Sequence, residues 1–504
     1  MNELLPLLVA IPLVGAVATL TLGSWSDRLA WPVTFLTMLV HVGLATAVAS
    51  TVYRGGTPLA TAVGGFTPPF GIELVVDGLN AAILVLVSAV AVGVLVYARR
   101  AGPHSVAFHT GYLLLAAGLS GMTITGDMFN LYVFLEITGL AAYALVATGD
   151  DGRAAVGALK YLLVGTVGAS LFLIGIGYAF VATGTLNMAD LAAKLATADP
   201  TLVGASFALV VTGLAVKTAL FPLHTWQPEA YASAPDSVSG LIAALVSTVS
   251  AYALARVTFS VYTVDFLTSS AFAQEFLLGL AGISIVAGSL LAVMQTEIKR
   301  MLAYSSVSQF GLVVAGVAIA NEAAVTGSLI HLVGHAVMKG GLFLAAGALA
   351  VVAGARTVED YDGLGARAPL LSAAFAVLSL SMVGIPPAVG FVGKWYIALG
   401  AIQAESWPIA VVILVSTLLT LAYFLRLVER MYFRTSSADV TSSTGTGATA
   451  VADGGDDDDA GLTRPSVGMV AVVVVAALLA VGLGPLVSTF EPLLEPTLEI
   501  LLQL

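Results

Sequence analysis

Long apolar segments alternate with short polar connections along almost the whole chain. Each apolar segment has about the 20 residues that an α-helix needs to cross the hydrocarbon core of a bilayer. We therefore expect an all-α polytopic membrane protein with about fourteen transmembrane helices. The predicted spans are 3–22, 30–52, 74–98, 106–125, 128–148, 155–182, 202–226, 237–262, 271–295, 301–320, 325–353, 369–399, 408–432 and 466–488.

Two of these spans, the seventh and the twelfth, contain internal prolines. Pro222 lies within 202–226, and Pro386 and Pro387 lie within 369–399. Proline lacks a backbone N–H and its ring clashes with the preceding helical turn. We expect both spans to be broken helices, in which the breaks serve as gates.

An internal repeat relates the two breaks. Lys160 and Lys339 each head a glycine-rich apolar run, and Lys217 and Lys394 follow them by 57 and 55 residues. The offset of about 178 residues corresponds to five spans, and an odd number inverts the second unit in the membrane. The predicted units are N-terminal helices 1–98, inverted five-helix repeats 99–262 and 263–432, an acidic loop 433–465, and a C-terminal helix and tail 466–504.

Composition narrows the class of protein further. The chain is 59% hydrophobic and 10% charged, with a mean hydropathy of +1.00. Cysteine is absent, which excludes disulfides and thiolate chemistry. No phosphate-binding loop, His-Glu-x-x-His or Gly-x-Ser-x-Gly signature occurs, and the net charge of −11 argues against nucleic acid. We expect neither a cofactor nor a metal site.

Basic residues concentrate in the loops that follow odd-numbered spans. By the positive-inside rule those loops are cytoplasmic, and both termini lie outside a multi-pass protein of the cell membrane. The segment 435–463 is rich in Ser, Thr, Gly and Asp and includes Asp456 to Asp459. Its composition predicts a disordered, solvated cytoplasmic loop and favours this over a metal site.

Lysines and arginines are distributed differently. All thirteen arginines lie in loops or near span ends, whereas Lys160, Lys217, Lys339 and Lys394 lie inside apolar spans. Arginine keeps its proton in proteins, but a desolvated lysine can release one. The choice of lysine inside the membrane therefore indicates proton transfer.

Other ionisable residues fit the same interpretation. Glu136 lies eight residues into the fifth span, where a nearby Lys217 would allow both to stay charged. A static ion pair that fixes helix packing is the alternative, but intramembrane ionisable groups usually mark pathways. His331, His335 and Lys339 share one helical stripe, which suggests a proton wire and not a metal site, because no carboxylate shares it.

Several longer motifs resemble one family, the antiporter-like proton-translocating subunits of Mrp-type sodium/proton antiporters, respiratory complex I and membrane-bound hydrogenases. The resemblance covers spans three to thirteen. It rests on Val76 to Asn80, Gly126 to Glu136, Ala158 to Leu163, Val216 to Trp226 with Pro235 and Val238-Ser239, Ile298 to Ser306, the stripe of the eleventh span, and Gly384 to Lys394.

The resemblance implies proton movement along a mid-membrane axis of charged and hydrated groups. Glu136 and Lys217 would form the gating pair, and Lys394 would be the terminal exchange site. The proton relay would comprise Lys160, His331, His335, Lys339 and Thr248. Family members usually work with other subunits of a membrane complex, and they move protons and, in the antiporters, sodium.

One residue departs from the family pattern. Members usually carry a lysine or histidine in the eighth span, where this chain has Thr248 beside Ser247 and Ser250. A hydroxyl can order water but cannot hold a charge. The middle of the wire must therefore rely on water and hydroxyls.

Three hypotheses follow. The first, favoured by the start Glu3 to Pro12, is an ion-translocating subunit that resembles the D-type subunit of Mrp antiporters, a secondary transporter and not an enzyme. The second is a proton-pumping subunit of a complex I-like NADH/quinone or hydrogenase complex. The third, motivated by Thr248, is a structural subunit whose ion path has been lost.

Overall fold

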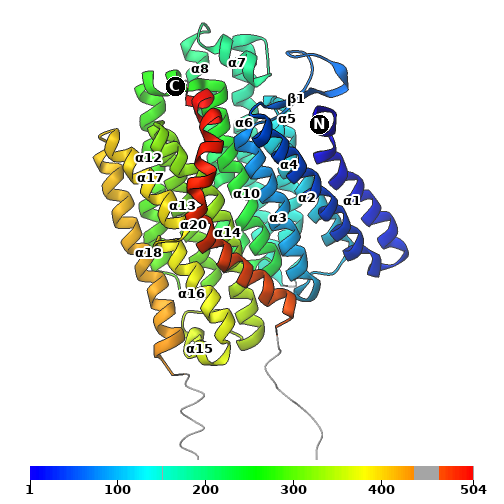
Figure 1. Ribbon diagram of the computed structural model, residues 1–504, viewed down its shortest axis with the longest axis vertical. Coiled ribbons are helices and arrows are strands. Elements are labelled where there is room, and N and C mark those ends of the chain that lie inside the picture. The colour runs from blue at the N-terminus through cyan, green and yellow to red at the C-terminus, as the bar shows by residue number, and fades with distance from the viewer. Residues whose placement is uncertain (150, 436–464, 503–504) are drawn as a thin grey trace, which may run out of the picture.

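Nearly the whole chain forms one bundle of membrane-spanning helices (Figure 1). The computed structural model describes residues 1–149, 151–435 and 465–502. The first helices are α1 (Leu7–Trp25), α2 (Ala30–Gly55), α3 (Gly78–Ala101), α4 (Val106–Ile124), α5 (Met128–Val146), α6 (Gly152–Thr183), α7 (Met188–Leu195), α8 (Pro200–Thr218), α9 (Gln227–Ser233) and α10 (Asp236–Val257). The remaining helices are α11 (Thr263–Ser269), α12 (Ala271–Val293), α13 (Ile298–Ile319), α14 (Glu322–Ala353), α15 (Leu364–Arg367), α16 (Pro369–Val383), α17 (Val389–Gln403), α18 (Trp407–Phe433) and α20 (Val467–Leu502).

The expected spans are confirmed. Within the described ranges, thirteen helices are long and apolar enough to cross a membrane. The remaining expected span, 369–399, is the broken pair α16–α17. In span 202–226 the helix α8 ends at Thr218, and the next helix, α9, begins only at Gln227, beyond the expected span. Both ends of the described chain lie at the same end of the bundle, as an even number of crossings requires (Figure 1).

The start of the third span differs from the expectation. Residues Glu73–Val76 form strand β2, which pairs antiparallel with β1 (Leu59–Ala62), so the helix cannot begin at residue 74. Asp77 caps the helix instead: its carboxylate accepts from the backbone N–H of Leu79 at 3.0 Å, and Asn80 Oδ1 accepts from the N–H of Asp77 at 2.7 Å. This reciprocal capping box fixes the first helical residue.

The C-terminal segment also differs. The predicted tail after residue 488 is helical, because α20 continues to Leu502. In Figure 1, α20 runs obliquely across the front of the bundle, and it contacts α3, α14, α16 and α17. The predicted acidic loop, including Asp456 to Asp459, lies outside the described residues.

Three helices form the interior of the bundle: α10, α13 and α14 are buried along most of their lengths. In contrast, α1, α2, α6 and α18 keep broad apolar faces exposed, as helices against lipid do. The histidines and the lysine of α14 are therefore held away from lipid, in the centre of the protein.

Close helix packing supports the first broken helix. A Cβ atom added at Gly213 of α8 would lie 2.6 Å from the carbonyl oxygen of Gly168 in α6. Small residues at such crossings let two backbones approach, which is how membrane helices gain packing energy.

We expect Gly213→Ala to lower the free energy of unfolding by about 1–3 kcal/mol, because the new methyl overlaps backbone atoms. Gly177→Ala in α6 is the matched control, since nothing lies within 4 Å of a Cβ at that position. The control should be neutral or slightly stabilising. Melting midpoints of the detergent-purified protein measure both, and equal midpoints would show that this close packing adds no stability.

Candidate functional site

The first break places a lysine at the end of a helix inside the bundle. Helix α8 ends at Thr218, where Ala219 takes a left-handed backbone conformation with φ 62°. Lys217 lies in the last turn of α8, and its side chain is only 4% exposed. The indole N–H of Trp226, just before α9, donates to the carbonyl of Val216 at 2.9 Å. A side chain thus satisfies a backbone carbonyl near the break.

Two side chains of α5 surround the Lys217 ammonium. Its Nζ donates to Glu136 Oε1 at 3.2 Å and to the Tyr143 hydroxyl at 3.1 Å. The structure therefore brings the expected pair together. Glu136 is 25% exposed, however, and so lies at the edge of the protein interior and not within it as we expected. Sequence reasoning missed Tyr143, although its spacing of seven residues from Glu136 places both on one face of α5.

At the second break, the lysine has different hydrogen-bond acceptors. Helix α16 ends at Val383, and Gly384 follows with a φ of 99°. Lys394 in α17 donates to the carbonyl oxygens of Met382 at 2.9 Å and Val383 at 3.1 Å. Within the described part of the chain, Lys394 forms no ion pair with a carboxylate. The break itself supplies the acceptors for this ammonium group.

His331, His335 and Lys339, which form the stripe on α14, are fully buried. The sequence predicted that they lie inside a transmembrane span. Lys339 donates to the Leu302 carbonyl at 3.1 Å and to Ser305 Oγ at 2.8 Å, both on α13. His331 Nε2 lies 3.0 Å from Gln309 Oε1. Neither ring nitrogen of His335 has a partner among the described residues. The only sequence signal for Ser305 and Gln309 is their polarity within an apolar span.

Thr248 lies in the fully buried part of α10, and its hydroxyl has no partner among the described residues. The neighbouring Ser247 accepts from Gln227 Nε2 at 3.3 Å and lies 3.0 Å from the Tyr231 hydroxyl. Hydroxyl and amide groups of α9 and α10 therefore meet at the residue next to Thr248.

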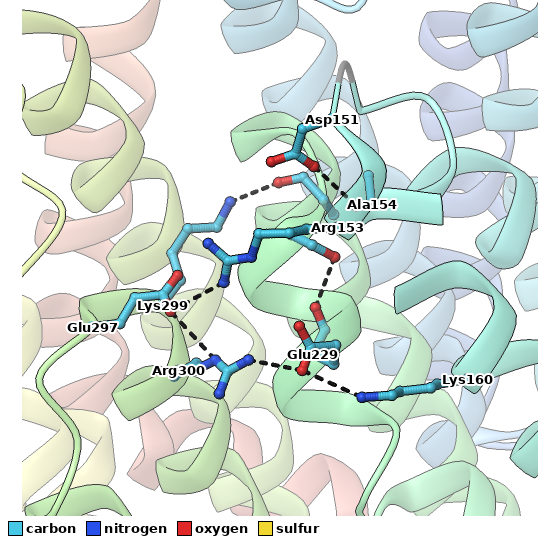
Figure 2. Close-up of polar contacts among 10 residues, drawn as sticks. Asp151, Arg153, Ala154, Lys160, Glu229, Glu297, Lys299 and Arg300 are labelled. Atoms are coloured by element: carbon cyan, nitrogen blue, oxygen red, sulfur yellow. Dashed lines mark hydrogen bonds and ion pairs between the residues drawn. The ribbon is translucent and has the colours of Figure 1, made fainter. Parts of the chain in front are cut away.

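Lys160 is not part of this buried set. Its side chain is 52% exposed, and its Nζ lies 3.5 Å from Glu229 Oε2. The Glu229 carboxylate also accepts a hydrogen bond from Arg300 Nη2, at 2.7 Å (Figure 2). Arg300 Nε lies 3.3 Å from Glu297 Oε2, and Arg153 Nη2 lies 3.4 Å from the same oxygen. This ion-pair network joins α6 and α9 to the start of α13.

An aromatic stack lies between this network and Lys217. The rings of Tyr161 and Trp226 stack at 3.8 Å, and Tyr161 meets Tyr143 edge-on at 4.5 Å. Tyr161 follows Lys160 directly, and Tyr143 contacts the Lys217 ammonium. The ion-pair network and the first lysine are therefore linked by packed side chains of α5, α6 and the residue just before α9.

The fold and these buried polar groups define a class: polytopic membrane proteins that hold titratable groups along their interior. The family model described as NADH:quinone oxidoreductase/Mrp antiporter, transmembrane, matches residues 125–420. The chain belongs to this family.

Similar proteins come from two kinds of membrane complex. The chain is 43% identical over 439 residues to the N-type subunit of the NADH-quinone oxidoreductase of Desulforudis audaxviator. It is 32% identical over 435 residues to the D-type subunit of the Na⁺/H⁺ antiporter of Bacillus subtilis. Each match covers 85% of this chain and 86% of the relative.

Solved structures agree in fold. A chain of an archaeal membrane-bound sulfane sulfur reductase matches with a TM-score of 0.89 and 30% identity, covering 99% of this chain and 98% of that one. A chain of the Mrp complex from Dietzia matches with a TM-score of 0.86 and 27% identity, covering 99% and 97%.

We expect Glu229→Ala to destabilise the protein, because it leaves Arg300 without its nearest carboxylate. The loss should be about 1–3 kcal/mol, the usual cost of removing one partner of a partly buried polar contact. Asp190→Ala is the control, since Asp190 forms an ion pair within one turn of α7 with Lys194, whose side chain is 46% exposed. If both variants melt at the wild-type temperature, the network has no structural role.

Proposed function

We propose that this chain is the ion-translocating subunit of a multisubunit Mrp-type sodium/proton antiporter in the cell membrane. Protons would move between Lys217 and Lys394 through buried polar groups, in exchange for sodium. The observation that carries the proposal is the pair of broken helices, each with a buried lysine at its break. The similarity to the D-type antiporter subunit from Bacillus subtilis supports this choice of complex.

Glu136 sets whether Lys217 keeps its proton. At 3.2 Å, the carboxylate stabilises the charged ammonium, and the Tyr143 hydroxyl supplies a second acceptor. Separation of the two groups, or protonation of Glu136, removes this stabilisation and favours release of a proton from the lysine. Because Glu136 is partly exposed, it is the member of the pair that its surroundings can reach.

The proton then passes a region without fixed charge. Thr248, Ser247 and Gln227 can hydrogen-bond to water, and ordered water among them would relay a proton that no side chain there can hold. Lys339 and His335 follow on α14. A neutral imidazole can accept a proton on one nitrogen and release one from the other, and both nitrogens of His335 are without a partner in the described part of the chain.

Lys394 is the final exchange site. Two carbonyl oxygens accept from its ammonium, but carbonyls carry no net charge, so no described counterion holds the proton there. In this proposal the loops after odd-numbered spans lie in the cytoplasm. The partners of this chain are the other subunits of the complex. In this assignment the chain is a transporter subunit and not an enzyme.

A second candidate is a proton-pumping subunit of a redox complex. The 43% identity to the N-type subunit of an NADH-quinone oxidoreductase favours it. The same line of lysines would then be driven by electron transfer in other subunits. Co-purifying proteins decide between the two: small antiporter subunits support the first proposal, and quinone-reducing or hydrogen-oxidising subunits support the second.

We expect Glu136→Ala to abolish antiport while the complex still assembles, because Lys217 loses its counterion. Exchange is measured in inverted membrane vesicles with a pH-sensitive dye after sodium is added. Glu275→Ala, at an exposed position of α12, is the control and should exchange normally. Undiminished exchange by an assembled Glu136→Ala complex would refute the gating role.

We expect Lys217→Ala to abolish exchange in the same assay, and Thr248→Lys not to raise it. Thr248 is fully buried and its hydroxyl has no partner among the described residues, so a charged lysine there would be costly to bury. The opposite pattern, with Lys217→Ala active and Thr248→Lys more active than wild type, would favour a structural subunit whose path has been lost.

A further inference from the structure

A long apolar slot lies between α3, α14 and α20, apart from the lysines and histidines described above. It has a volume of about 470 Å³. Its lining runs along α3 from Leu79 to Val94 and along α14 from Leu329 to Leu344. Fifteen helical rises of 1.5 Å give each wall a length of about 22 Å. Helix α20, which crosses in front of both, forms the third wall (Figure 1).

The chemistry of the slot suits hydrocarbon. Every lining side chain is apolar except that of Tyr53, whose hydroxyl already donates to the Gly78 carbonyl at 2.7 Å. Ordered water needs two or more polar partners, which this lining does not offer. Small residues such as Gly93 and Ala89 keep the slot open: a Cβ at Gly93 would meet only Val472, at 3.8 Å.

A second cavity, of about 310 Å³, adjoins the slot where α3 begins. The two cavities share Tyr53 and Leu493. The second one is more polar than the slot, because its apolar residues are joined by a few polar ones: Arg256, Asp77, Thr57, Ser260 and Thr497. Arg256 pairs with Asp77 through one nitrogen, and 17% of its side chain is exposed. A guanidinium has five N–H donors, so donors remain for a further acceptor.

We propose that the two cavities together bind one phospholipid of the surrounding bilayer, with a hydrocarbon chain in the slot and the phosphate beside Arg256. Half of a bilayer's hydrocarbon core is about 15 Å thick, so a slot of about 22 Å accommodates a full chain of one leaflet. Guanidinium groups match phosphate oxygens in geometry and charge.

The slot is unsuited to a helix of a partner subunit. Packed helices lie about 8–10 Å apart, and α20 already contacts both α3 and α14 along this face. Inside a bilayer, water exclusion does not drive the binding of a lipid chain, because the chain leaves other lipids and not water. Close fit and the head-group contacts must supply the affinity.

Filling the slot tests the proposal. The complex containing this chain is purified in mild detergent, and its retained phospholipid is counted by native mass spectrometry. Gly93→Leu puts a side chain into the slot, whereas Gly177→Leu puts the same side chain on an exposed face of α6 with open space around it. We expect the wild type and Gly177→Leu to retain one phospholipid per chain that Gly93→Leu loses.

A second variant, Ala89→Phe, fills the same slot from another position and covers the case in which Gly93→Leu fails to fold. Equal retention by the wild type and a folded slot variant would overturn the proposal. Adding phospholipid back to the delipidated complex should raise the melting midpoint of the wild type but not of the slot variants. If a single-chain alcohol without phosphate gives the same rise, the assignment of the polar cavity to the phosphate is wrong.

Discussion

The structure depends on one constraint: an ammonium group buried in a membrane protein must have acceptors, and a regular helix has few carbonyl groups to spare, because its own N–H groups use them. Each broken helix meets this need in its own way. At the first break the acceptors of Lys217 are the side chains of Glu136 and Tyr143, contributed by α5. At the second break the acceptors of Lys394 are carbonyls that the interrupted helix α16 leaves free. The prolines that break the helices and the lysines buried at the breaks therefore serve one purpose together.

This difference gives the two ends of the proposed proton path different properties. The carboxylate of Glu136 is the counterion of Lys217, so the protonation state of Glu136 can control that lysine. Among the described residues, Lys394 has only uncharged carbonyl groups as acceptors. Between them, α10 and α14 supply hydroxyls and imidazoles in the most enclosed part of the bundle. Such an arrangement suits a group that changes its charge during a cycle better than a static ion pair, which rarely adds net stability when buried.

Much of the fold could be predicted because its signals are local. Hydropathy marked the spans, and proline marked both breaks. The pairing of Glu136 with Lys217 followed from the family resemblance, and it agrees with the cost of leaving either charge alone. What could not be predicted depends on tertiary contacts: Tyr143 and Ser305 as acceptors, and the exposure of Lys160. The strand before Asp77 was missed because its apolar residues resemble the start of a helix. The helical end of α20 was missed because the predicted apolar span ended at residue 488.

The central claim is that the lysines at the breaks must release and regain protons, and do not merely provide positive charge. Lys394→Arg tests this most directly, because arginine keeps the charge but does not give up its proton. Proton movement is measured with a pH-sensitive dye in inverted vesicles that contain the assembled complex. We predict that the variant assembles and moves no protons. Proton movement at the wild-type rate would contradict the claim.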